Sequence, residues 1–460
     1  MSVKYSGQDF NLEDLAARLS SPLLLPQEEA YAQALQVWNK KVSKRPAALV
    51  RCMNVQDVVE AVRWAGVYGM PLSVRGGGHD YAGRSLCDNG LVIDCSQMKA
   101  VSITPERRIA RVQGGATVVD LIDAAQKYGL ATATGICSSV GLGGLTLGGG
   151  YGPLTGQCGL VADNLISAQV VTADGAVLTA SAEEHSDLFW GLRGGGGNFG
   201  VVVSLEYRLH PIAKVLSGLL LYPIDRSDAI LSRFNDFLPI CPDELTVPSG
   251  FIQTPNGPML FLAPVYCGPP DQGDGLIGQL LNFGEPIHNQ IQPNGYDELI
   301  RSVDALLPHG RHYFTQTQSL KGFRNGSIEV LSNAAREFPS PFSLINIHHF
   351  HGAASRVELS ETAFGLRQDH LMVEIIAAWD HQSAEDDQVH VQWAQQGSRA
   401  LAPFAFRESY INLLDVGEAE RVPLAFGSNY ERMLTVKRSY DPTDLFQSTV
   451  GHVRLGPMER

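Results

Sequence analysis

The sequence predicts an α+β fold built from two regions that differ in composition. Helix-like and strand-like segments alternate up to Pro211, as in domains where helices pack against a sheet. From residue 212 to about residue 404 the glycine clusters disappear, and strand-like runs such as GPMLFLAPVY and FSLINIHHFH lie between helical stretches. The second region is therefore expected to contain an antiparallel sheet. A length of 460 residues allows two or three domains.

The elements of the first region follow from local signals. Residues 1–45 are interpreted as a helical lead-in. A helix is expected to begin after Asn54, a favourable N-cap residue, and to end at Gly69 and Pro71. The dipeptide Asp174-Gly175 predicts a hairpin turn. The other expected elements are the strands LSVR, LVIDCS (91–96), IARVQGG (109–115) and VVVSLEYRLHP (201–211), the helix VVDLIDAAQKYG (118–129), and a tail helix (429–446) that ends at Asp441-Pro442.

Composition and charge limit the classes of partner. Apolar residues make up 44% of the chain. The chain contains 35 Lys and Arg and 48 Asp and Glu, which gives a net charge of −13. Such an acidic globular protein is not expected to bind nucleic acid or anionic lipid. The N-terminus lacks the pattern of a secretory signal, and no apolar run approaches the roughly 20 residues of a membrane span. We therefore expect a cytoplasmic protein.

The cysteines and histidines do not predict a metal centre. The seven cysteines are irregularly spaced and form no CxxC pair, which argues against a disulfide framework or a zinc finger. His348, His349 and His351 are clustered, but on a strand at most His349 and His351 can converge. No third ligand is evident, so a structural or substrate-lining role is favoured over metal binding.

Three glycine-dense segments demand an explanation, because ordering glycine costs conformational entropy. They are RGGGHDYAG (75–83), GICSSVGLGGLTLGGGYG (135–152) and GGGGNFG (194–200). The third contains a formal G-x-G-x-x-G, but a helical segment precedes it and a strand follows it, which is the reverse of a dinucleotide fold. No G-K-[ST] follows any of them, so a phosphate-binding P-loop is excluded.

The first two glycine segments each carry one potential nucleophile. These are His79 in RGGGH and Cys137 in GICSSVG. Either residue alone would be unremarkable as a turn histidine or a buried thiol. Together, in loops that follow β-like segments of the same region, they indicate two side chains that face one flat, electrophilic ligand.

At these residues the sequence resembles the FAD-linked oxidases of the berberine-bridge-enzyme type, within the vanillyl-alcohol-oxidase fold. The matching stretches are RGGGHDYAG, GICSSVGLGGLTLGGGYG, GLVADNLISAQVVTADG, DLFWGLRGGGGNFGVV and NYERMLTVKRSYDPTDLF. The resemblance implies a bicovalent FAD, bonded through its 8α-methyl group to His79 and through C6 to Cys137. It also implies a two-part FAD-binding domain of the PCMH type (1–211 and 405–460) with an inserted substrate domain (212–404), an antiparallel sheet covered by helices.

The resemblance also implies a set of cofactor contacts. Glycine amides can approach the pyrophosphate closely, because loop N–H groups form anion-binding concavities. In the family the residue three after the attachment cysteine, here Val140, lines the approach to the flavin C4a edge. The tail departs from the family, with QSTVGH (447–452) in place of an asparagine-rich stretch. The expected contacts are Arg75, Gly76, Gly77, Gly78, Asp80, Ser138, Val140, Gly141, Gly143, Gly144, Gly148, Gly149, Gly150, Tyr151, Gly152, Asn198, Gly200 and Val201.

A catalytic set is carried over in the same way. RQDHLMVEIIAAW (367–379) resembles the family's substrate-domain strand and places Glu374 in the position of the general base. A glutamate among apolar residues on both faces of a strand is unusual, which supports this role. ESYINLLD (408–415) resembles the strand that would bring Tyr410 and Asn412 to the flavin, on one face of that strand.

The predicted function is that of an FAD-linked oxidase. A small-molecule substrate, which could be a sugar, an alkaloid-like amine or a secondary-metabolite alcohol, would reduce the flavin, and O₂ would reoxidise it to give H₂O₂. One alternative is a dehydrogenase that passes its electrons to another acceptor. A second is a flavin-binding protein without turnover. A monomer or a homodimer is expected.

Overall fold

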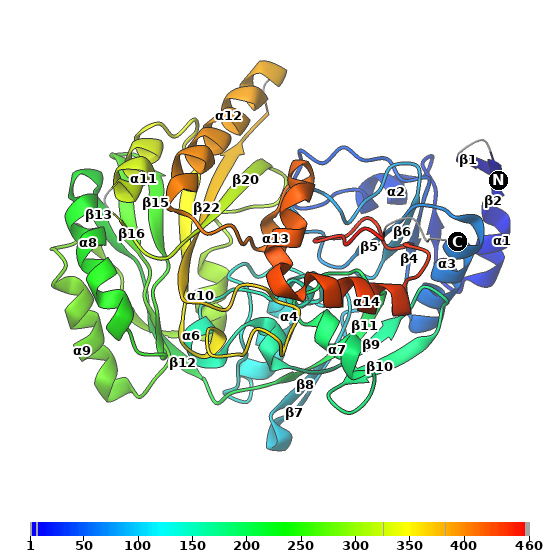
Figure 1. The fold of residues 1–460 in the computed structure, drawn as a ribbon, viewed down its shortest axis with the longest axis horizontal. Coiled ribbons are helices and arrows are strands. Elements are labelled where there is room, and N and C mark those ends of the chain that lie inside the picture. The colour runs from blue at the N-terminus through cyan, green and yellow to red at the C-terminus, as the bar shows by residue number, and fades with distance from the viewer. Residues whose placement is uncertain (1, 6–7, 325, 382, 456–460) are drawn as a thin grey trace.

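A computed structural model describes residues 2–5, 8–324, 326–381 and 383–455 as two lobes (Figure 1). The first lobe contains the N-terminal elements and the tail helix α14 (Tyr430–Tyr440), which packs on α7 (Ser186–Leu192). The second lobe contains the segments between them. None of the helices in the described ranges combines the length and apolar character that crossing a bilayer requires.

Two larger sheets form the centre of the first lobe. One has the order β3-β4-β6-β5, in which β4, β6 and β5 are parallel, and the other is the antiparallel sheet β10-β9-β11-β8-β7. Their strands are β3 (Leu23–Leu24), β4 (Ala48–Arg51), β5 (Leu72–Arg75), β6 (Leu91–Asp94), β7 (Val101–Thr104), β8 (Ile109–Gln113), β9 (Leu165–Val171), β10 (Val177–Ser181) and β11 (Val201–Arg208). The other helices of this lobe are α1 (Leu12–Arg18), α2 (Glu29–Ala34), α3 (Val55–Tyr68), α4 (Val118–Gln126), α5 (Leu142–Leu147), α6 (Thr155–Cys158) and α13 (Val422–Phe426).

The second lobe is built on a seven-stranded antiparallel sheet in the order β18-β13-β16-β15-β21-β22-β20, with a four-stranded sheet β14-β17-β12-β19 beside it. Its strands are β12 (Lys214–Ser217), β13 (Leu220–Pro223), β14 (Leu245–Thr246), β15 (Ser249–Thr254), β16 (Gly257–Leu262), β17 (Val265–Tyr266), β18 (His288–Asn289), β19 (Gln292–Gly295), β20 (His312–Leu320), β21 (Leu344–Phe350) and β22 (His370–Trp379). Its helices are α8 (Ser227–Phe237), α9 (Pro270–Leu281), α10 (Tyr296–Ser302), α11 (Ser327–Arg336) and α12 (Ala384–Leu401). Helices α8, α11 and α12 bury one face of the large sheet, where Val373 and Ile375 of β22 pack.

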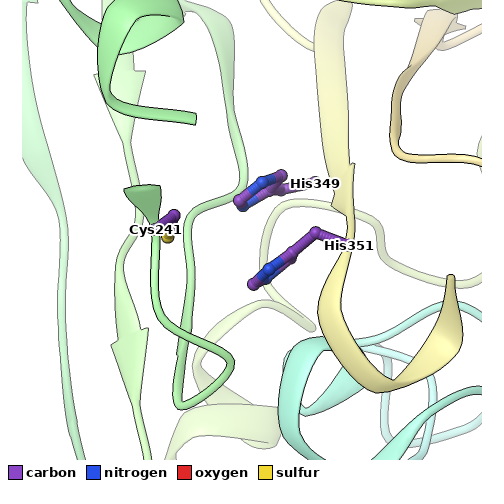
Figure 2. A group of neighbouring side chains, drawn as sticks. All are labelled: Cys241, His349 and His351. Atoms are coloured by element: carbon purple, nitrogen blue, oxygen red, sulfur yellow. The ribbon is translucent and has the colours of Figure 1, made fainter. Parts of the chain in front are cut away.

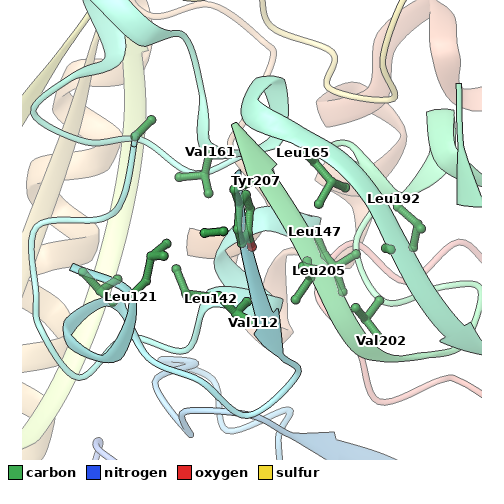
Figure 3. Close-up of a cluster of buried hydrophobic side chains, with 14 of the residues drawn as sticks. Val112, Leu121, Leu142, Leu147, Val161, Leu165, Leu192, Val202, Leu205 and Tyr207 are labelled. Atoms are coloured by element: carbon green, nitrogen blue, oxygen red, sulfur yellow. The ribbon is translucent and has the colours of Figure 1, made fainter. Parts of the chain in front are cut away.

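The core of the first lobe fixes the second glycine segment. Leu142 and Leu147 of α5 pack with Tyr207 and Leu205 of β11 (Figure 3). The Tyr207 hydroxyl lies 2.6 Å from the hydroxyl of Thr146 on the same helix. Burial of these side chains stabilises a short helix in a glycine-rich sequence that has little helical propensity of its own.

Most predicted elements are confirmed. Helix α3 begins after Asn54, whose side chain accepts a hydrogen bond from the Asp57 amide, and ends at Gly69 with φ 61°. Strands β9 and β10 form the hairpin expected at Asp174-Gly175. The third glycine segment lies between helix α7 and strand β11, in the inverted order that excludes a dinucleotide fold.

Three local predictions are wrong. Residues 1–45 are not wholly helical, because β1 (Ser2–Tyr5) pairs with β2 (Gln8–Asn11) before α1. Residues 135–152 are not a continuous loop, since α5 forms where its leucines find the core. Residues 408–415 are not a strand but an irregular segment with the 3₁₀ turn η7 (Ile411–Leu413).

We propose domain boundaries at residues 211 and 404, as the sequence predicts. One buried cluster joins residues of the first lobe to tail residues such as Phe426 and Met433, and it also includes Val265, Tyr296 and Ile300 of the second lobe. Another consists of residues 220–401 alone. The return of the tail to the first cluster and the separate second cluster support a first domain that is interrupted in sequence by the second, with the two domains packed against each other.

Candidate active site

A cavity of about 300 Å³ lies where the two lobes meet. Its walls come from the first two glycine segments, from β21 and β22 of the second lobe, and from the tail. It is lined by fifteen of the residues that the sequence assigns to the site: Gly76, Gly77, Gly78, His79, Asp80, Cys137, Val140, Gly141, Gly143, Gly144, Tyr151, Gly200, Glu374, Tyr410 and Asn412.

His79 is held in one orientation by its neighbours. Its Nε2 lies 2.7 Å from the Ser139 hydroxyl, and its ring stacks on Trp38 with centroids 4.8 Å apart. Burial, with a smaller contribution from His309, lowers the pKa of His79 to about 3, so the imidazole is neutral at pH 7. Among the described residues Nδ1 of His79 has no hydrogen-bond partner, which leaves that nitrogen available as a nucleophile.

Cys137 is positioned through the residue that follows it. The Ser138 amide and hydroxyl donate hydrogen bonds of 3.0 and 2.5 Å to the carboxylate of Asp304 in the second lobe. Burial, followed by the charges of Asp304 and Glu374, raises the pKa of Cys137 to about 12. The free side chain is therefore a thiol at pH 7, directed to the same cavity as His79.

The glycines make room for a flat ligand. A Cβ on Gly77 would lie 2.4 Å from the Gly141 nitrogen, so the two glycine segments touch as bare backbone. A Cβ on Gly144 would meet nothing within 4 Å, because this glycine faces the cavity. Side chains at these positions would separate the segments or fill the cavity. The side chains of His79 and Cys137 and the bare glycine backbone between them thus fit an FAD that is held from both edges.

The other eight predicted contacts do not line this cavity but shape the backbone around it. Arg75 donates to the carbonyls of Ala34 and Gln36, and Ser138 binds Asp304. The carbonyls of Gly195 and Gly451 and the Val453 amide bind the side chain of Asn198. Close packing explains the glycines, since a Cβ would collide with Asn412, Phe364, Val161 or the Thr134 carbonyl. These eight residues are Arg75, Ser138, Gly148, Gly149, Gly150, Gly152, Asn198 and Val201, the last of which is a core residue.

Glu374 faces the cavity from the middle of β22. It is 5% exposed and lies between Thr317 of β20 and Asn346 of β21, its two cross-strand partners. Its Oε2 is 3.4 Å from Nε2 of His348, and burial followed by the Glu374 charge raises the pKa of Tyr81 well above its usual value. The carboxylate therefore stands in a polar patch on an otherwise apolar sheet.

Tyr410 and Asn412 meet at the cavity although their segment is not a strand. The amide of Asn412 donates to the Tyr410 hydroxyl at 2.9 Å, and the Gly150 N–H donates to it at 3.2 Å. Burial raises the pKa of Tyr410 to about 12, so the phenol keeps its proton. With both acceptor positions occupied, its O–H is left to donate into the cavity.

The structure adds lining residues that the sequence did not single out. Tyr81, Asn346 and Met372 line the cavity, and the Tyr151 hydroxyl bonds Nε2 of His370 at 2.7 Å. Tyr81 lies in the RGGGHDYAG motif and could have been found there, whereas no sequence signal identifies Trp38 or Asp304. The divergent tail still reaches the site, through Phe446, Ser448, Thr449 and Val450.

Comparisons with known proteins identify the family of the chain. A family model described as FAD binding domain matches residues 46–181, and one described as berberine and berberine like matches residues 409–451. An FAD-linked oxidoreductase of Dictyostelium discoideum is 30% identical over 415 residues, which cover 89% of each chain. The (R)-6-hydroxynicotine oxidase of Paenarthrobacter nicotinovorans is 28% identical over 458 residues, which cover 94% of this chain and 98% of that protein.

The fold is shared with solved structures. A crystal structure of 6-hydroxy-D-nicotine oxidase from Arthrobacter nicotinovorans superposes with a TM-score of 0.86 at 27% identity, over 95% of this chain and 98% of that one. The xylooligosaccharide oxidase of Myceliophthora thermophila shares the fold alone, with a TM-score of 0.86 at 24% identity over 96% of this chain and 99% of that one. The chain therefore belongs to the berberine-bridge-enzyme-like family of FAD-linked oxidases.

Proposed function

We propose that this protein oxidises a small alcohol, sugar or amine with an FAD attached through both His79 and Cys137, and passes the electrons to O₂ to form H₂O₂. The observation that carries the proposal is that His79, Cys137 and Glu374 line one cavity. The full-length similarity to an oxidase that acts on 6-hydroxynicotine supports a substrate with an oxidisable C–H beside oxygen or nitrogen.

Each residue has a role that follows from its surroundings. Bound FAD supplies a two-electron acceptor for hydride. Glu374 takes the proton of the substrate O–H or N–H, so that the neighbouring carbon can release its hydride and become C=O or C=N. Tyr410 donates a hydrogen bond that orients the substrate, and His348 and Asn346 bind its polar groups on the Glu374 side.

Double attachment has a direct chemical test. We expect acid-precipitated protein to stay yellow, because both bonds survive unfolding. His79→Ala and Cys137→Ala should each keep flavin bound through the remaining bond, and the double variant should release it on denaturation. Flavin in the supernatant of the unsubstituted protein after acid precipitation would contradict the proposal.

Oxygen access gives a second expected result. Val140 lines the cavity directly after the Cys137 turn, and it is small enough to leave a path for O₂. Val140→Leu should slow reoxidation of the reduced enzyme while leaving its reduction by substrate unchanged, because the added methylene narrows that path. Val140→Ala is the matched control and should reoxidise at least as fast as the parent. Equal rates for all three proteins would mean that the path lies elsewhere.

The function as a whole is tested by a substrate panel read by H₂O₂. Turnover should consume one O₂ and release one H₂O₂ per substrate oxidised. Reduction by substrate without reoxidation in air would favour the dehydrogenase alternative. Absence of bleaching by every alcohol, sugar and amine tested would favour a flavin-binding protein without turnover.

A further inference from the structure

A cysteine and two histidines of the second lobe lie together outside the cavity (Figure 2). Cys241 lies between the turn η4 (Leu238–Ile240) and β14, His349 lies in β21, and His351 follows that strand. One potential ligand atom from each residue lies within 4.8 Å of the others. The convergence of His349 and His351 that the sequence predicts is confirmed, with stacked rings 3.9 Å apart.

No third ligand is evident from the sequence, but the structure places Cys241, a potential third ligand, beside the two histidines. Cys241 comes from a segment far earlier in the chain, four residues before β14, whose Thr246 hydroxyl lies 3.5 Å from Nε2 of His351. His348 points the other way, to the active-site cavity, because alternate residues of a strand face opposite sides. Of the three clustered histidines, His348 therefore belongs to the active-site cavity, and His349 and His351 lie beside Cys241.

Each of the two imidazoles has a nitrogen that could bind a metal ion. His349 is 5% exposed and its Nδ1 has no hydrogen-bond partner among the described residues, which is costly for a buried polar atom. Nε2 of His351 has only a long 3.5 Å contact with the Thr246 hydroxyl. Burial holds the pKa of His349 well below its usual value and lowers that of His351 to about 4, so both rings are neutral at pH 7.

The charges around the group favour a cation. Asp243 and Asp369 are close enough to raise the pKa of His351, and Arg356 offsets part of this field through its ion pair with Asp243. The Cys241 thiol donates to the Leu245 carbonyl at 3.1 Å. On metal binding its proton would pass to the buffer, and the thiolate would add one further negative charge.

We propose that Cys241, His349 and His351 form a binding site for Zn²⁺, with water as the fourth ligand. Sulfur and imidazole nitrogen are ligands of zinc and of softer metals, not of Mg²⁺ or Ca²⁺. Zinc bonds of about 2.3 Å to sulfur and about 2.0 Å to nitrogen place tetrahedral ligands roughly 3.3–3.6 Å apart. The ligand atoms now lie within 4.8 Å of one another, and the two stacked rings must rotate out of their parallel arrangement for both lone pairs to point to one ion.

The site would join the two sheets of the second lobe. Cys241 is attached to β14 of the four-stranded sheet and the histidines to β21 of the seven-stranded sheet. The same strand carries Asn346 and His348 to the active-site cavity. A bound zinc ion would therefore stabilise the position of β21, which supports one wall of the active-site cavity. The ion itself would take no part in the reaction.

The test uses the full-length flavoenzyme, loaded with Co²⁺ as a spectroscopic probe and with Zn²⁺ for stoichiometry. We expect one tightly bound metal per chain, a thiolate-to-cobalt charge-transfer band, and a higher melting temperature with Zn²⁺. Cys241→Ser should abolish the band and weaken Zn²⁺ binding at least about tenfold, and His349→Gln should weaken binding similarly. Metal-free Cys241→Ser should keep the oxidase activity of the metal-free parent.

A second cluster provides the matched control. His312, His381 and Asp387 also lie close together, but Nδ1 of His381 and Nε1 of Trp379 already bind Asp387, and His381 is 46% exposed. His381→Asn should leave Zn²⁺ binding unchanged. The proposal is overturned if the unsubstituted protein gives no thiolate band with Co²⁺, or if His381→Asn removes the metal. Binding of Cu⁺ without any binding of Zn²⁺ or Co²⁺ would also overturn the proposal.

Discussion

Replacing Glu374 by glutamine is expected to lower the rate of flavin reduction by at least about 10²-fold, because a positioned general base contributes about 10²–10⁴-fold to such a step. Glutamine keeps the shape of the side chain but has no basic oxygen pair. The carboxylate is 5% exposed and faces His348 and Tyr81, so no bulk water replaces it as a base. Covalent attachment and substrate affinity should be unchanged.

The measurement is anaerobic stopped-flow reduction with saturating substrate. The matched control is Glu206→Gln on β11, where the glutamate pairs with Arg111 away from the cavity, and it should reduce at the parental rate. A loss confined to KM would indicate that Glu374 only binds substrate. Near-normal reduction by Glu374→Gln would show that Glu374 is not the base.

Replacing Lys437 by methionine should lower the free energy of unfolding by about 3–5 kcal/mol, the usual cost of removing one partner of a buried ion pair. Nζ of Lys437 lies 2.7 Å from Asp441 and 2.8 Å from Asp444. The side chains of Lys437 and Asp441 are 0% exposed, and the Asp441 carboxylate also accepts the amides of Leu445 and Phe446. Methionine would leave two carboxylates without their cation.

Denaturant unfolding followed by circular dichroism measures this change. Arg18→Met removes an exposed i,i+4 partner of Asp14 and should cost less than about 1 kcal/mol. A comparable loss in both variants would show that methionine, rather than the broken pair, is responsible. A loss below about 1 kcal/mol for Lys437→Met would show that water reaches the carboxylates.

Local sequence signals were sufficient to predict the elements that have capping or turn residues at their ends or a clear apolar pattern. Helix α3 has Asn54 and Gly69 at its boundaries, and β22 is an apolar run in which Glu374 is conspicuous. His79 and Cys137 could be predicted because glycine-dense loops are rare and surround them. All three side chains line the cavity, although their chemical roles stay predictions.

The remaining features depend on contacts between distant segments. Asp304, which holds Ser138, and Trp38, which stacks on His79, lie in stretches without a distinctive pattern. Cys241 becomes a neighbour of His349 only because the segment before β14 lies near β21 in the folded chain. The family resemblance predicts a strand for Tyr410 and Asn412, but hydrogen bonds from Gly150 to Tyr410 and from Asn412 to Tyr410 bring them together instead.

The return of the tail to the first lobe has a consequence for biosynthesis. Phe446 belongs to the core around β4 and β6, and the Val453 amide donates a hydrogen bond to the side chain of Asn198. The tail residues that line the cavity are Phe446, Ser448, Thr449 and Val450. A ribosome makes these residues after the whole second lobe. The second lobe can thus fold during translation, whereas the nascent first lobe stays open until the tail emerges. We therefore expect cofactor loading to follow the synthesis of residue 450, and truncation before that residue to leave the cavity without part of its wall.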